Sequence, residues 1–393
     1  MPLLRRRELL ACALAGCGAR AVAAPAGGTA PLQLLRTGDI GGLPWIELEL
    51  QGASTRWLVD SGASAALISP ALAERLKLPS LSPLRVAMAG GVQTLPRFKL
   101  PALPGADAEA DMPAIALDLQ QLLGESGGRF DGALGAPWLR TRITRFDFAA
   151  GQLRWVGTAP MPPAGAVVLL LRWDQGLPVL SLALGARAPE GFVFDTGNAG
   201  ALVVFAKRAE ALMREAKDLP QATVPELGGN VRAGFARIER LEAPGWVAQQ
   251  VPAALESGTE ARRGMHFDRL AGSLGSALFE PGAVTLDGPG ERLIVELPGL
   301  PETAPLPGGF GFRLEGGGGL RIGAVIDGSP AAAAGLQAGD AVQAVDGADA
   351  RAWSPAQAWQ ALAGRERVAL QLYRDSQSRR IELRRERFFP LLR

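Results

Sequence analysis

The chain carries two copies of a short apolar run that ends on Asp, a hydroxyl residue and Gly. The first is Trp57-Leu-Val-Asp-Ser-Gly62, and the second is Phe192-Val-Phe-Asp-Thr-Gly197. One such triplet is ordinary turn chemistry. Two copies constrain the chain far more, because a pair of carboxylates that share one proton can activate water for hydrolysis.

Matching short motifs (landmarks) occur in the same order around both triplets, as expected of an internal repeat. An apolar-apolar-Gly sequence ends at Gly135, 75 positions after Asp60, and a related Ser-Leu-Gly ends at Gly275, 80 positions after Asp195. An Asp then follows each of these glycines after 12 positions. Because the spacings agree within five residues, the sequence predicts two copies of one lobe, at 33–157 and 166–297. A Pro-rich stretch at 159–164 separates the two copies.

These paired motifs resemble the pepsin and retropepsin aspartic proteases, and most closely the bacterial two-lobed retropepsin-like proteins. The resemblance covers roughly residues 33–297. It implies a mainly β fold of two pseudo-symmetric retropepsin-like lobes, whose Asp-containing turns meet at a pseudo-twofold axis. It also implies that each apolar-apolar-Gly strand supports its own Asp loop, and that the two hydroxyl residues hydrogen-bond across the axis. The residues it assigns to the site are the catalytic Asp60 and Asp195 and the turn residues Ser61, Gly62, Thr196 and Gly197.

The chemistry of such a pair follows from electrostatics. Two carboxylates about 3 Å apart cannot both ionise, so they share one proton and titrate as a coupled pair. The ionised member takes a proton from water, while the protonated member polarises the carbonyl of the bond to be cleaved. The glycine after each hydroxyl residue is expected to allow a tight turn that a side chain would obstruct. No cofactor is implied by this chemistry.

Two features depart from the family pattern. Asn198 stands where family members usually carry Ser, Thr or Ala, so it either hydrogen-bonds near Asp195 and shifts its titration or marks a weakened site. The flap of pepsin-like enzymes usually carries a Tyr, but the single tyrosine here is Tyr373. The expected flap is therefore the Gly90-Gly91 turn, and Gly228-Gly229 is a matching second flap or an ordinary hairpin turn.

Composition supports a globular β protein. Of the 393 residues, 48% are apolar and 20% are charged, and 50 Gly with 30 Pro suit an architecture rich in turns. A net charge of +2 does not suggest a nucleic-acid surface. The lone His266 and the lack of nearby Cys exclude a His/Cys zinc site, so no metal is expected. The arginines at 379–387 alternate with Glu and are expected to form a solvated strand face.

The first 24 residues resemble an export signal. Arg5-Arg6-Arg7 precedes a modest apolar core, and Ala21-Val22-Ala23 offers a small-x-small cleavage site. Arg6-Arg7 also resembles a twin-arginine signal. Leu14-Ala15-Gly16-Cys17 resembles a bacterial lipobox, with Cys17 as the lipidated residue. The sequence therefore predicts export to a bacterial envelope, in the periplasm or on a lipid anchor, with membrane contact only through that anchor.

A second module follows the Pro-rich stretch at 298–307. Its Gly309-Phe310-Gly311-Phe312, together with later Gly-Asp and Asp-Gly turns, resembles a PDZ domain (a small β-barrel with helices) over residues 305–388. The resemblance implies that free N–H groups of the Gly-Phe-Gly-Phe loop take a peptide C-terminal carboxylate, while an edge strand accepts the peptide. The groove helix is expected at 355–363, with Ser354 as its N-cap. Packing or dimerisation without a bound peptide is the alternative role.

These features lead to two functional hypotheses. The first is an exported aspartic endopeptidase that cleaves protein or peptide substrates, with substrates or partners recruited by the PDZ domain. The second is a catalytically inactive, protease-like peptide- or protein-binding protein of the cell envelope. Asn198 and the flap without a tyrosine motivate the second hypothesis.

Overall fold

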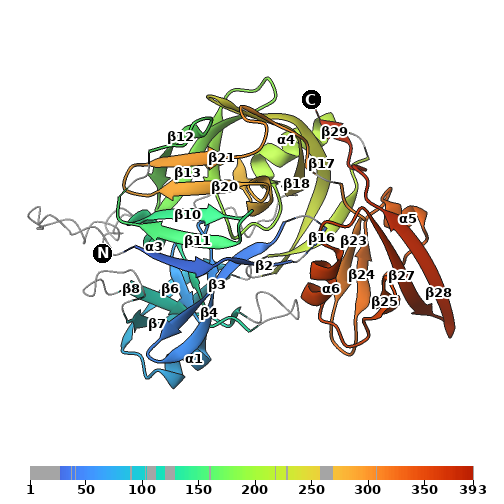
Figure 1. Ribbon diagram of the computed structural model, residues 1–393, viewed down its shortest axis with the longest axis horizontal. Helices are drawn as coiled ribbons and strands as arrows, with labels where there is room; N and C mark the ends of the chain where they lie inside the picture. The colour runs from blue at the N-terminus through green and yellow to red at the C-terminus, as the bar shows by residue number, and fades with distance from the viewer. Residues whose placement is uncertain are drawn as a thin grey trace, which may run out of the picture.

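The protein is described by a computed structural model, whose ribbon is drawn in Figure 1. The structure describes residues 27–36, 38–39, 41–88, 91–101, 103, 112–119, 129–158, 161–216, 218–226, 229–256, 269–306 and 308–392. Strands dominate these residues and confirm the predicted mainly β fold. The predicted export signal, Cys17, Gly90, Gly228 and His266 lie outside the described residues.

The first lobe is built on one eight-stranded sheet. Its strands, in spatial order, are β2 (Gln33–Leu35), β3 (Leu43–Leu50), β4 (Ala53–Val59), β9 (Gly132–Leu134), β5 (Ala66–Ile68), β8 (Met112–Ala116), β7 (Gly91–Leu100) and β6 (Ser80–Met88). In β3 the residues alternate between buried Ile46 and Leu48 and exposed Glu47 and Glu49, the pattern of a strand with one face in the core. Helix α1 (Pro70–Arg75) begins at the Ser69 cap, and α3 (Ala136–Arg140) follows β9.

The second lobe repeats this arrangement. Its strands, in spatial order, are β12 (Val167–Asp174), β13 (Leu177–Leu184), β14 (Glu190–Phe194), β19 (Gly272–Leu274), β15 (Leu202–Val204), β18 (Trp246–Glu256), β17 (Gly229–Ala243) and β16 (Gln221–Glu226). Helix α4 (Ala206–Glu215) follows β15 as α1 follows β5, and the short 3-10 helix η3 (Ser276–Leu278) follows β19 as α3 follows β9. The duplication inferred from the sequence is thus visible in the order of strand pairings.

Six strands join the lobes, and the last of them, β12, also begins the sheet of the second lobe. In spatial order they are β1 (Gly28–Pro31), β11 (Gln152–Val156), β10 (Ile143–Asp147), β20 (Ala283–Asp287), β21 (Arg292–Glu296) and β12. The central strands β10 and β20 are antiparallel, with Ile143 opposite Asp287 and Asp147 opposite Ala283. The repeated Asp landmarks therefore end the two central strands. Their carboxylates accept the N–H groups of Ala150 and Gly290 and close equivalent turns.

One continuous hydrophobic core spans both lobes. Its centre holds aromatic rings from the second lobe and from the joining strands, with Phe146, Phe194 and Phe279 in edge-on contact at 5.4–6.3 Å between ring centroids. All three side chains are fully buried. Because Phe194 directly precedes Asp195, this core fixes the strand that presents the second Asp. Phe146 lies on β10, so its contact with Phe194 packs this core against the strands that join the lobes.

The C-terminal segment forms a separate six-stranded sheet with its own core. Its strands are β23 (Phe312–Glu315), β24 (Arg321–Val325), β25 (Ala341–Val345), β26 (Ala348–Asp349), β27 (Arg367–Arg374) and β28 (Gln377–Arg384). Helices α5 (Pro330–Ala333) and α6 (Pro355–Leu362) pack on it. Ser354 caps α6 in a capping box with Gln357, which confirms the predicted N-cap.

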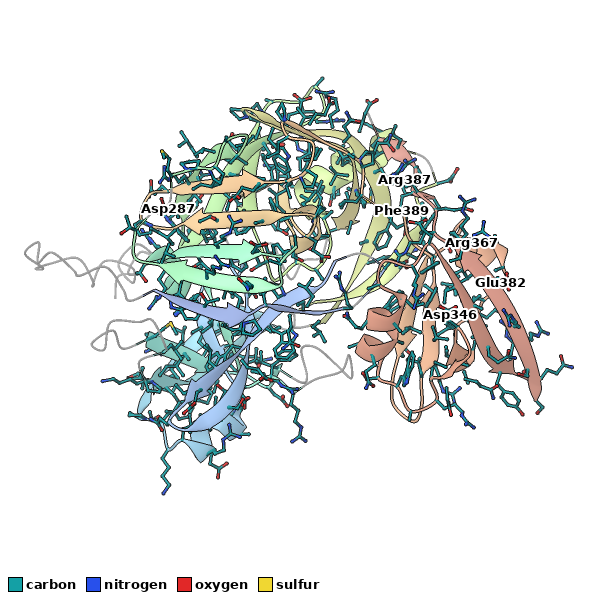
Figure 2. The ribbon with its side chains drawn as sticks, viewed as in Figure 1. Asp287, Asp346, Arg367, Glu382, Arg387 and Phe389 are labelled. Atoms are coloured by element: carbon teal, nitrogen blue, oxygen red, sulfur yellow. The ribbon has the colours of Figure 1, made fainter. Side chains whose placement is uncertain are left out.

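Both ends of this segment are attached to the second lobe. Strand β22 (Glu302–Thr303) pairs with β18, and β29 (Leu391–Leu392) pairs with β17. Arg237 on β17 donates to the carbonyl of Phe389 at 2.7 Å, and Phe389 stacks on Phe235. Figure 2 shows Arg387 and Phe389 between the second lobe and the C-terminal sheet. The segment is therefore anchored to the lobe on two sides.

Candidate active site

Each Asp of the repeated triplets lies directly after a buried strand. Val59 ends β4, and the N–H of Asp60 donates to the carbonyl of Leu134 at 2.9 Å. Phe194 ends β14, and the N–H of Asp195 donates to the carbonyl of Leu274 at 2.9 Å. In both lobes these bonds continue a parallel pairing, β4 with β9 and β14 with β19. The apolar-apolar-Gly strand thus supports the Asp loop of its own lobe.

The hydroxyl residues of the two triplets, Ser61 and Thr196, form hydrogen bonds between the lobes. The N–H of Thr196 donates to the hydroxyl of Ser61 at 2.9 Å, and the N–H of Ser61 donates to the hydroxyl of Thr196 at 3.0 Å. Each hydroxyl in turn donates to a carbonyl of the opposite lobe, Ser61 to Phe194 and Thr196 to Val59. Both side chains are fully buried. Four hydrogen bonds therefore fix the two turns against each other.

This exchange brings the two carboxyl groups into hydrogen-bond contact. The N–H of Gly62 donates to Asp60 Oδ1 at 2.9 Å, and the N–H of Gly197, from the other lobe, also bonds the Asp60 carboxyl. The carboxyl of Asp195 accepts from the backbone of Gly197 and Asn198. Both carboxyl residues stay partly exposed, so water can reach them. The pair is held by N–H groups of both turns.

The two glycines of the triplets are needed for a different reason from the expected one. Neither Gly62 nor Gly197 has a positive φ, so turn geometry alone does not demand glycine. A Cβ at Gly62 would instead lie 2.2 Å from Asp195 Oδ1, and a Cβ at Gly197 would lie 2.3 Å from Asp60 Oδ1. Glycine at each position leaves room for the carboxyl of the opposite lobe. The requirement comes from the pairing of the lobes.

Both carboxyl groups hold their protons more strongly than usual. Burial raises the pKa of Asp60, although backbone N–H groups oppose the shift. Burial and the charge of Asp60 raise the pKa of Asp195 to about 7. Because the groups touch, these values belong to the pair, which therefore retains one proton up to near-neutral pH. A singly protonated pair is the form that can act as acid and base together.

Ser273 is a site residue that sequence reasoning passed over. Its hydroxyl hydrogen-bonds the Asp195 carboxyl and favours the ionised form. The amide of Asn198 donates to the Ser273 hydroxyl at 3.2 Å, while its oxygen accepts the N–H of Gly200. The side chain of Asn198 therefore acts on Asp195 through Ser273 and leaves the carboxyl pair intact. The repeat held a signal for this role of Ser273, because the equivalent position of the first lobe is Ala133, which has no hydroxyl.

Two long hairpins occupy the predicted flap positions. Gly91 begins β7 and pairs with Met88 at the end of β6, and Gly229 begins β17 and pairs with Glu226 of β16. Gly91 and Gly229 thus each begin the second strand of a hairpin. Gly90 itself lies outside the described residues, as does Gly228.

The predicted peptide-binding loop of the C-terminal segment is already engaged. Phe310 and Phe312 are buried in its core, and Gly311 has a φ of +83°, which a side chain would strain. The sequence predicted free N–H groups here, and this is wrong. The N–H groups of Phe310 and Gly311 donate to the carboxylate of Asp39. Sequence reasoning could not bring residues 271 positions apart together.

The arginines near the C-terminus are not all solvated. Arg379 and Arg380 are exposed as expected, but Arg385 is 9% exposed and donates to the carbonyls of Leu362 and Arg365. Its charge is stabilised by carbonyl oxygens and by the ring of Phe310, 4.6 Å away. The expectation of a fully solvated strand face is therefore wrong at this position.

The described residues offer no candidate metal site and no candidate membrane-spanning helix. In those ranges no group of three or more His, Cys, Asp or Glu residues is placed to hold a metal ion. Within the same residues, no helix combines the length and apolar character that crossing a membrane requires.

Comparison with protein families matches two parts of the chain. Residues 46–138 match the aspartyl protease family, and residues 302–373 match the PDZ domain family. The chain thus contains an aspartyl protease domain and a C-terminal PDZ domain. The protease match ends in the first lobe, so the second Asp-Thr-Gly enters the site through the structural repeat. A search among curated proteins finds no match.

Proposed function

We propose that this protein is an aspartic endopeptidase that hydrolyses peptide bonds of protein or peptide substrates with water activated by Asp60 and Asp195. The observation that carries the proposal is the hydrogen-bond contact between the two carboxyls, one from each lobe. The exchange of hydrogen bonds between Ser61 and Thr196 supports it, because it holds the pair at fixed geometry before substrate binds. The whole pair is contained in one chain.

In this mechanism the pair holds one proton and a water molecule. The ionised carboxylate takes a proton from the water as the oxygen attacks the peptide carbonyl carbon. The protonated carboxyl donates its hydrogen bond to the carbonyl oxygen, where negative charge develops. As the C–N bond breaks, a proton passes from the pair to the departing nitrogen. Proton transfers within the pair restore its single proton for the next cycle.

The inactive, peptide-binding alternative has lost its main motivation. Asn198 suggested a weakened site, but its amide hydrogen-bonds Ser273 and leaves both carboxyls in contact. No contact among the described residues favours this alternative. It nevertheless makes a distinct prediction, namely binding of peptides without turnover.

The test of the proposal is cleavage of an unfolded protein by the wild type and by Asp60→Asn and Asp195→Asn variants. Each substitution should reduce kcat by at least about 100-fold, since each removes a group that transfers protons. Asp218→Asn is the matched control, because Asp218 is exposed in the second lobe, and it should cleave as the wild type does. Undiminished cleavage by both dyad variants would falsify the assignment.

The PDZ domain supports binding of a peptide or protein, and we propose that it positions substrates or partners for the protease domain. Recognition of a peptide C-terminal carboxylate by the Gly309–Phe312 loop is the corresponding proposal for the ligand chemistry. The Asp39 carboxylate accepts the N–H groups of Phe310 and Gly311 that such a ligand would use.

We further propose that the protein is exported to the bacterial envelope, directed by residues 1–24. Two forms follow from the sequence there, a soluble periplasmic protein and one lipidated at Cys17. Mass spectrometry of the mature N-terminus after cell fractionation separates them. A lipidated form begins at Cys17 and loses its lipid mass in a Cys17→Ser variant. An intact N-terminus in the cytoplasmic fraction contradicts export altogether.

A further inference from the structure

The PDZ loop expected to bind a peptide C-terminus is occupied by a carboxylate from the first lobe. Asp39 lies between β2 and β3, and its two oxygens each accept one loop N–H. The N–H of Phe310 donates to Oδ1 at 2.9 Å, and the N–H of Gly311 donates to Oδ2 at 2.8 Å. Successive N–H groups that converge on one carboxylate are how a backbone loop captures a peptide C-terminus.

The loop accommodates this carboxylate closely. A Cβ at Gly309 would lie 2.7 Å from Asp39 Oδ2, so glycine is needed for the approach. Arg385 adds a second connection, because its Nη1 donates to the backbone carbonyl of Asp39 at 2.8 Å and to that of Gly308 at 3.0 Å. Burial raises the pKa of Asp39, although the two N–H bonds and the charge of Arg385 oppose the shift.

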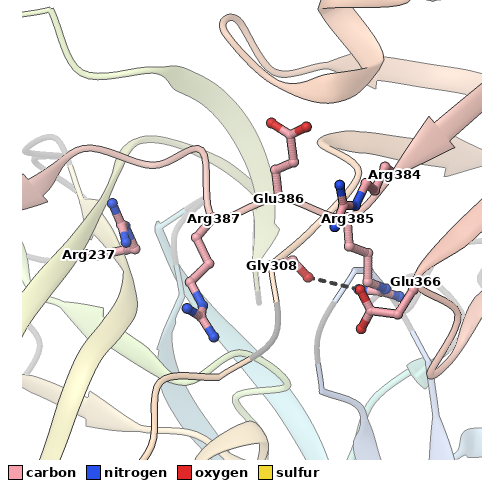
Figure 3. A pocket seen from close by; sticks show the side chains of 7 residues that line it. All are labelled: Arg237, Gly308, Glu366, Arg384, Arg385, Glu386 and Arg387. Atoms are coloured by element: carbon pink, nitrogen blue, oxygen red, sulfur yellow. Dashed lines mark hydrogen bonds between the residues drawn. The ribbon is translucent and has the colours of Figure 1, made fainter.

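A cavity of about 490 Å³ adjoins this contact. Figure 3 shows Arg385 bonded to Gly308 on one side of it and Arg237 of the second lobe on the other. Arg387 donates to the carbonyl of Leu306 within the C-terminal segment, and Arg237 of the second lobe donates to the carbonyl of Phe389. The cavity lies at the junction of the PDZ domain with the second lobe.

The first-lobe segment before Asp39 also runs alongside α6, the helix that would line the peptide groove. A cavity of about 540 Å³ is bounded by residues 32–36 on one side and by Ala356, Gln357 and Gln360 of α6 on the other. Ala356 packs on the cluster that contains Leu35. Among the described residues, β23 is an edge strand of the PDZ sheet. The segment thus passes α6 and places Asp39 at the carboxylate end of the groove.

The other side of the same segment contacts the second catalytic loop. A Cβ at Gly41 would lie 1.7 Å from the carbonyl oxygen of Ala199, four residues after Asp195. The hydroxyl of Ser276 donates to the carbonyl of Gly42 at 2.6 Å, and the N–H of Ser276 donates to the carbonyl of Asn198 at 2.9 Å. Asp39 thus contacts the PDZ loop, while Gly41 and Gly42 contact the loop that carries Asp195.

We propose that Asp39 is an internal ligand of the PDZ carboxylate-binding loop, and that a protein with a free C-terminal carboxylate binds there only by displacing it. The inference rests on the proposed peptide-binding role of the PDZ domain and is independent of catalysis.

The test is hydrogen exchange of the Phe310 and Gly311 amides, followed by mass spectrometry in the full chain. To prevent cleavage of the probe, all proteins carry Asp60→Asn. With Asp39 present these amides should be protected, and Asp39→Ala should speed their exchange about 10- to 100-fold, the effect of losing hydrogen bonds to a charged group. Asp39→Asn keeps the shape and one acceptor and should fall between the two. Asp327→Ala removes an exposed PDZ carboxylate and should change nothing.

The ligand arm uses an acetylated Ala-Ala-Ala-Val tetrapeptide with a free C-terminal carboxylate, and the same peptide amidated. The acid should slow exchange in Asp39→Ala at concentrations that leave the parent protein unchanged, and the amide should slow neither. Three outcomes overturn the proposal. These are unaltered protection in Asp39→Ala, equal binding of the acid with and without Asp39, and no response of Asp39→Ala to the acid. Since no arm measures cleavage, these failures are separate from failure of the proposed protease activity.

Discussion

The hydroxyls of Ser61 and Thr196 each accept the other residue's N–H, at 3.0 Å or less, across the junction of the two lobes. Each then donates to the carbonyl of the residue before the opposite Asp. The position of one Asp loop is thus set by the backbone of the other lobe. Any change at this exchange should affect both stability and the distance between the carboxyls.

Replacing Ser61 with Ala, or Thr196 with Val, should destabilise the protein by about 1–3 kcal/mol, because each leaves buried backbone groups without a partner. Urea unfolding measures this loss. Activity should fall with it, since the two Asp loops lose their mutual alignment. Ser64→Ala alters an exposed hydroxyl in the same turn and should match the wild type. Equal stability of Ser61→Ala and Ser64→Ala would show that the exchange does not hold the lobes.

Adding one methyl group at Gly62 or Gly197 should abolish cleavage. The new Cβ would lie within 2.3 Å of a carboxyl oxygen of the opposite lobe, so the pair must separate. Gly234→Ala is the control, because its Cβ would meet neighbours at ordinary distances of 3.5 Å or more and its φ is not positive. The measurement is the cleavage rate of Gly62→Ala, Gly197→Ala and Gly234→Ala, and only the last should cleave as the wild type does. Normal turnover by Gly62→Ala would mean that the carboxyls need not touch.

Ser273→Ala should move the alkaline limb of the activity profile to higher pH. The Ser273 hydroxyl stabilises ionised Asp195, so its loss raises the pKa of that carboxyl further. The pair then keeps its shared proton to higher pH. A profile of kcat/KM against pH measures the shift. The control is Ser181→Ala, at an exposed position on β13, which pairs with β14. A limb that stays in place or moves to lower pH contradicts the assigned hydrogen bond.

The raised pKa of Asp195 should also appear in stability. The folded protein keeps this proton up to about pH 7, whereas the unfolded chain releases it near pH 4. Folding is therefore favoured below pH 4, and this contribution is lost as pH rises towards 7. Asp195→Asn should lack that part of the decline. Glu256, whose burial raises its pKa to about 8, contributes equally to both proteins, so their difference reports on the Asp60–Asp195 pair alone.

Thermal unfolding from pH 3 to pH 9 measures this difference. The stability of the wild type relative to Asp195→Asn should fall between about pH 4 and pH 7 and then level off. Asp218→Asn, at an exposed position, should run parallel to the wild type throughout. A wild-type-to-variant difference that is constant with pH would mean that Asp195 titrates alike in the folded and unfolded chains.

The repeat made much of the fold readable from the sequence. Corresponding landmarks end corresponding strands, and the helices α1 (Pro70–Arg75) and α4 (Ala206–Glu215) follow equivalent strands in the two lobes. The capped helix α6 was equally local, since Ser354 and Gln357 bond within one turn. Such features depend on neighbours a few residues apart, which a single sequence displays directly.

The roles of Ser273 and Asp39 could not be predicted. Ser273 reaches Asp195 from a strand 78 positions away, and Asp39 reaches Gly311 over 272 positions. Ser273 lies in the Ser-Leu-Gly landmark and Asp39 in no motif, but neither position has a local pattern that identifies its hydrogen-bond partner. For Ser273, the contrast with Ala133 in the first lobe was the one available signal.

The sequence by itself determined that two equivalent turns would each carry an Asp, since repeated spacing reflects repeated strands. Only the tertiary structure decided what surrounds them. It showed that Gly62 and Gly197 make room for the opposite carboxyl, that Asn198 acts through Ser273, and that Asp39 occupies the PDZ loop. Periodicity and turn chemistry are local properties of a chain, whereas close approach and burial arise only when distant segments pack together.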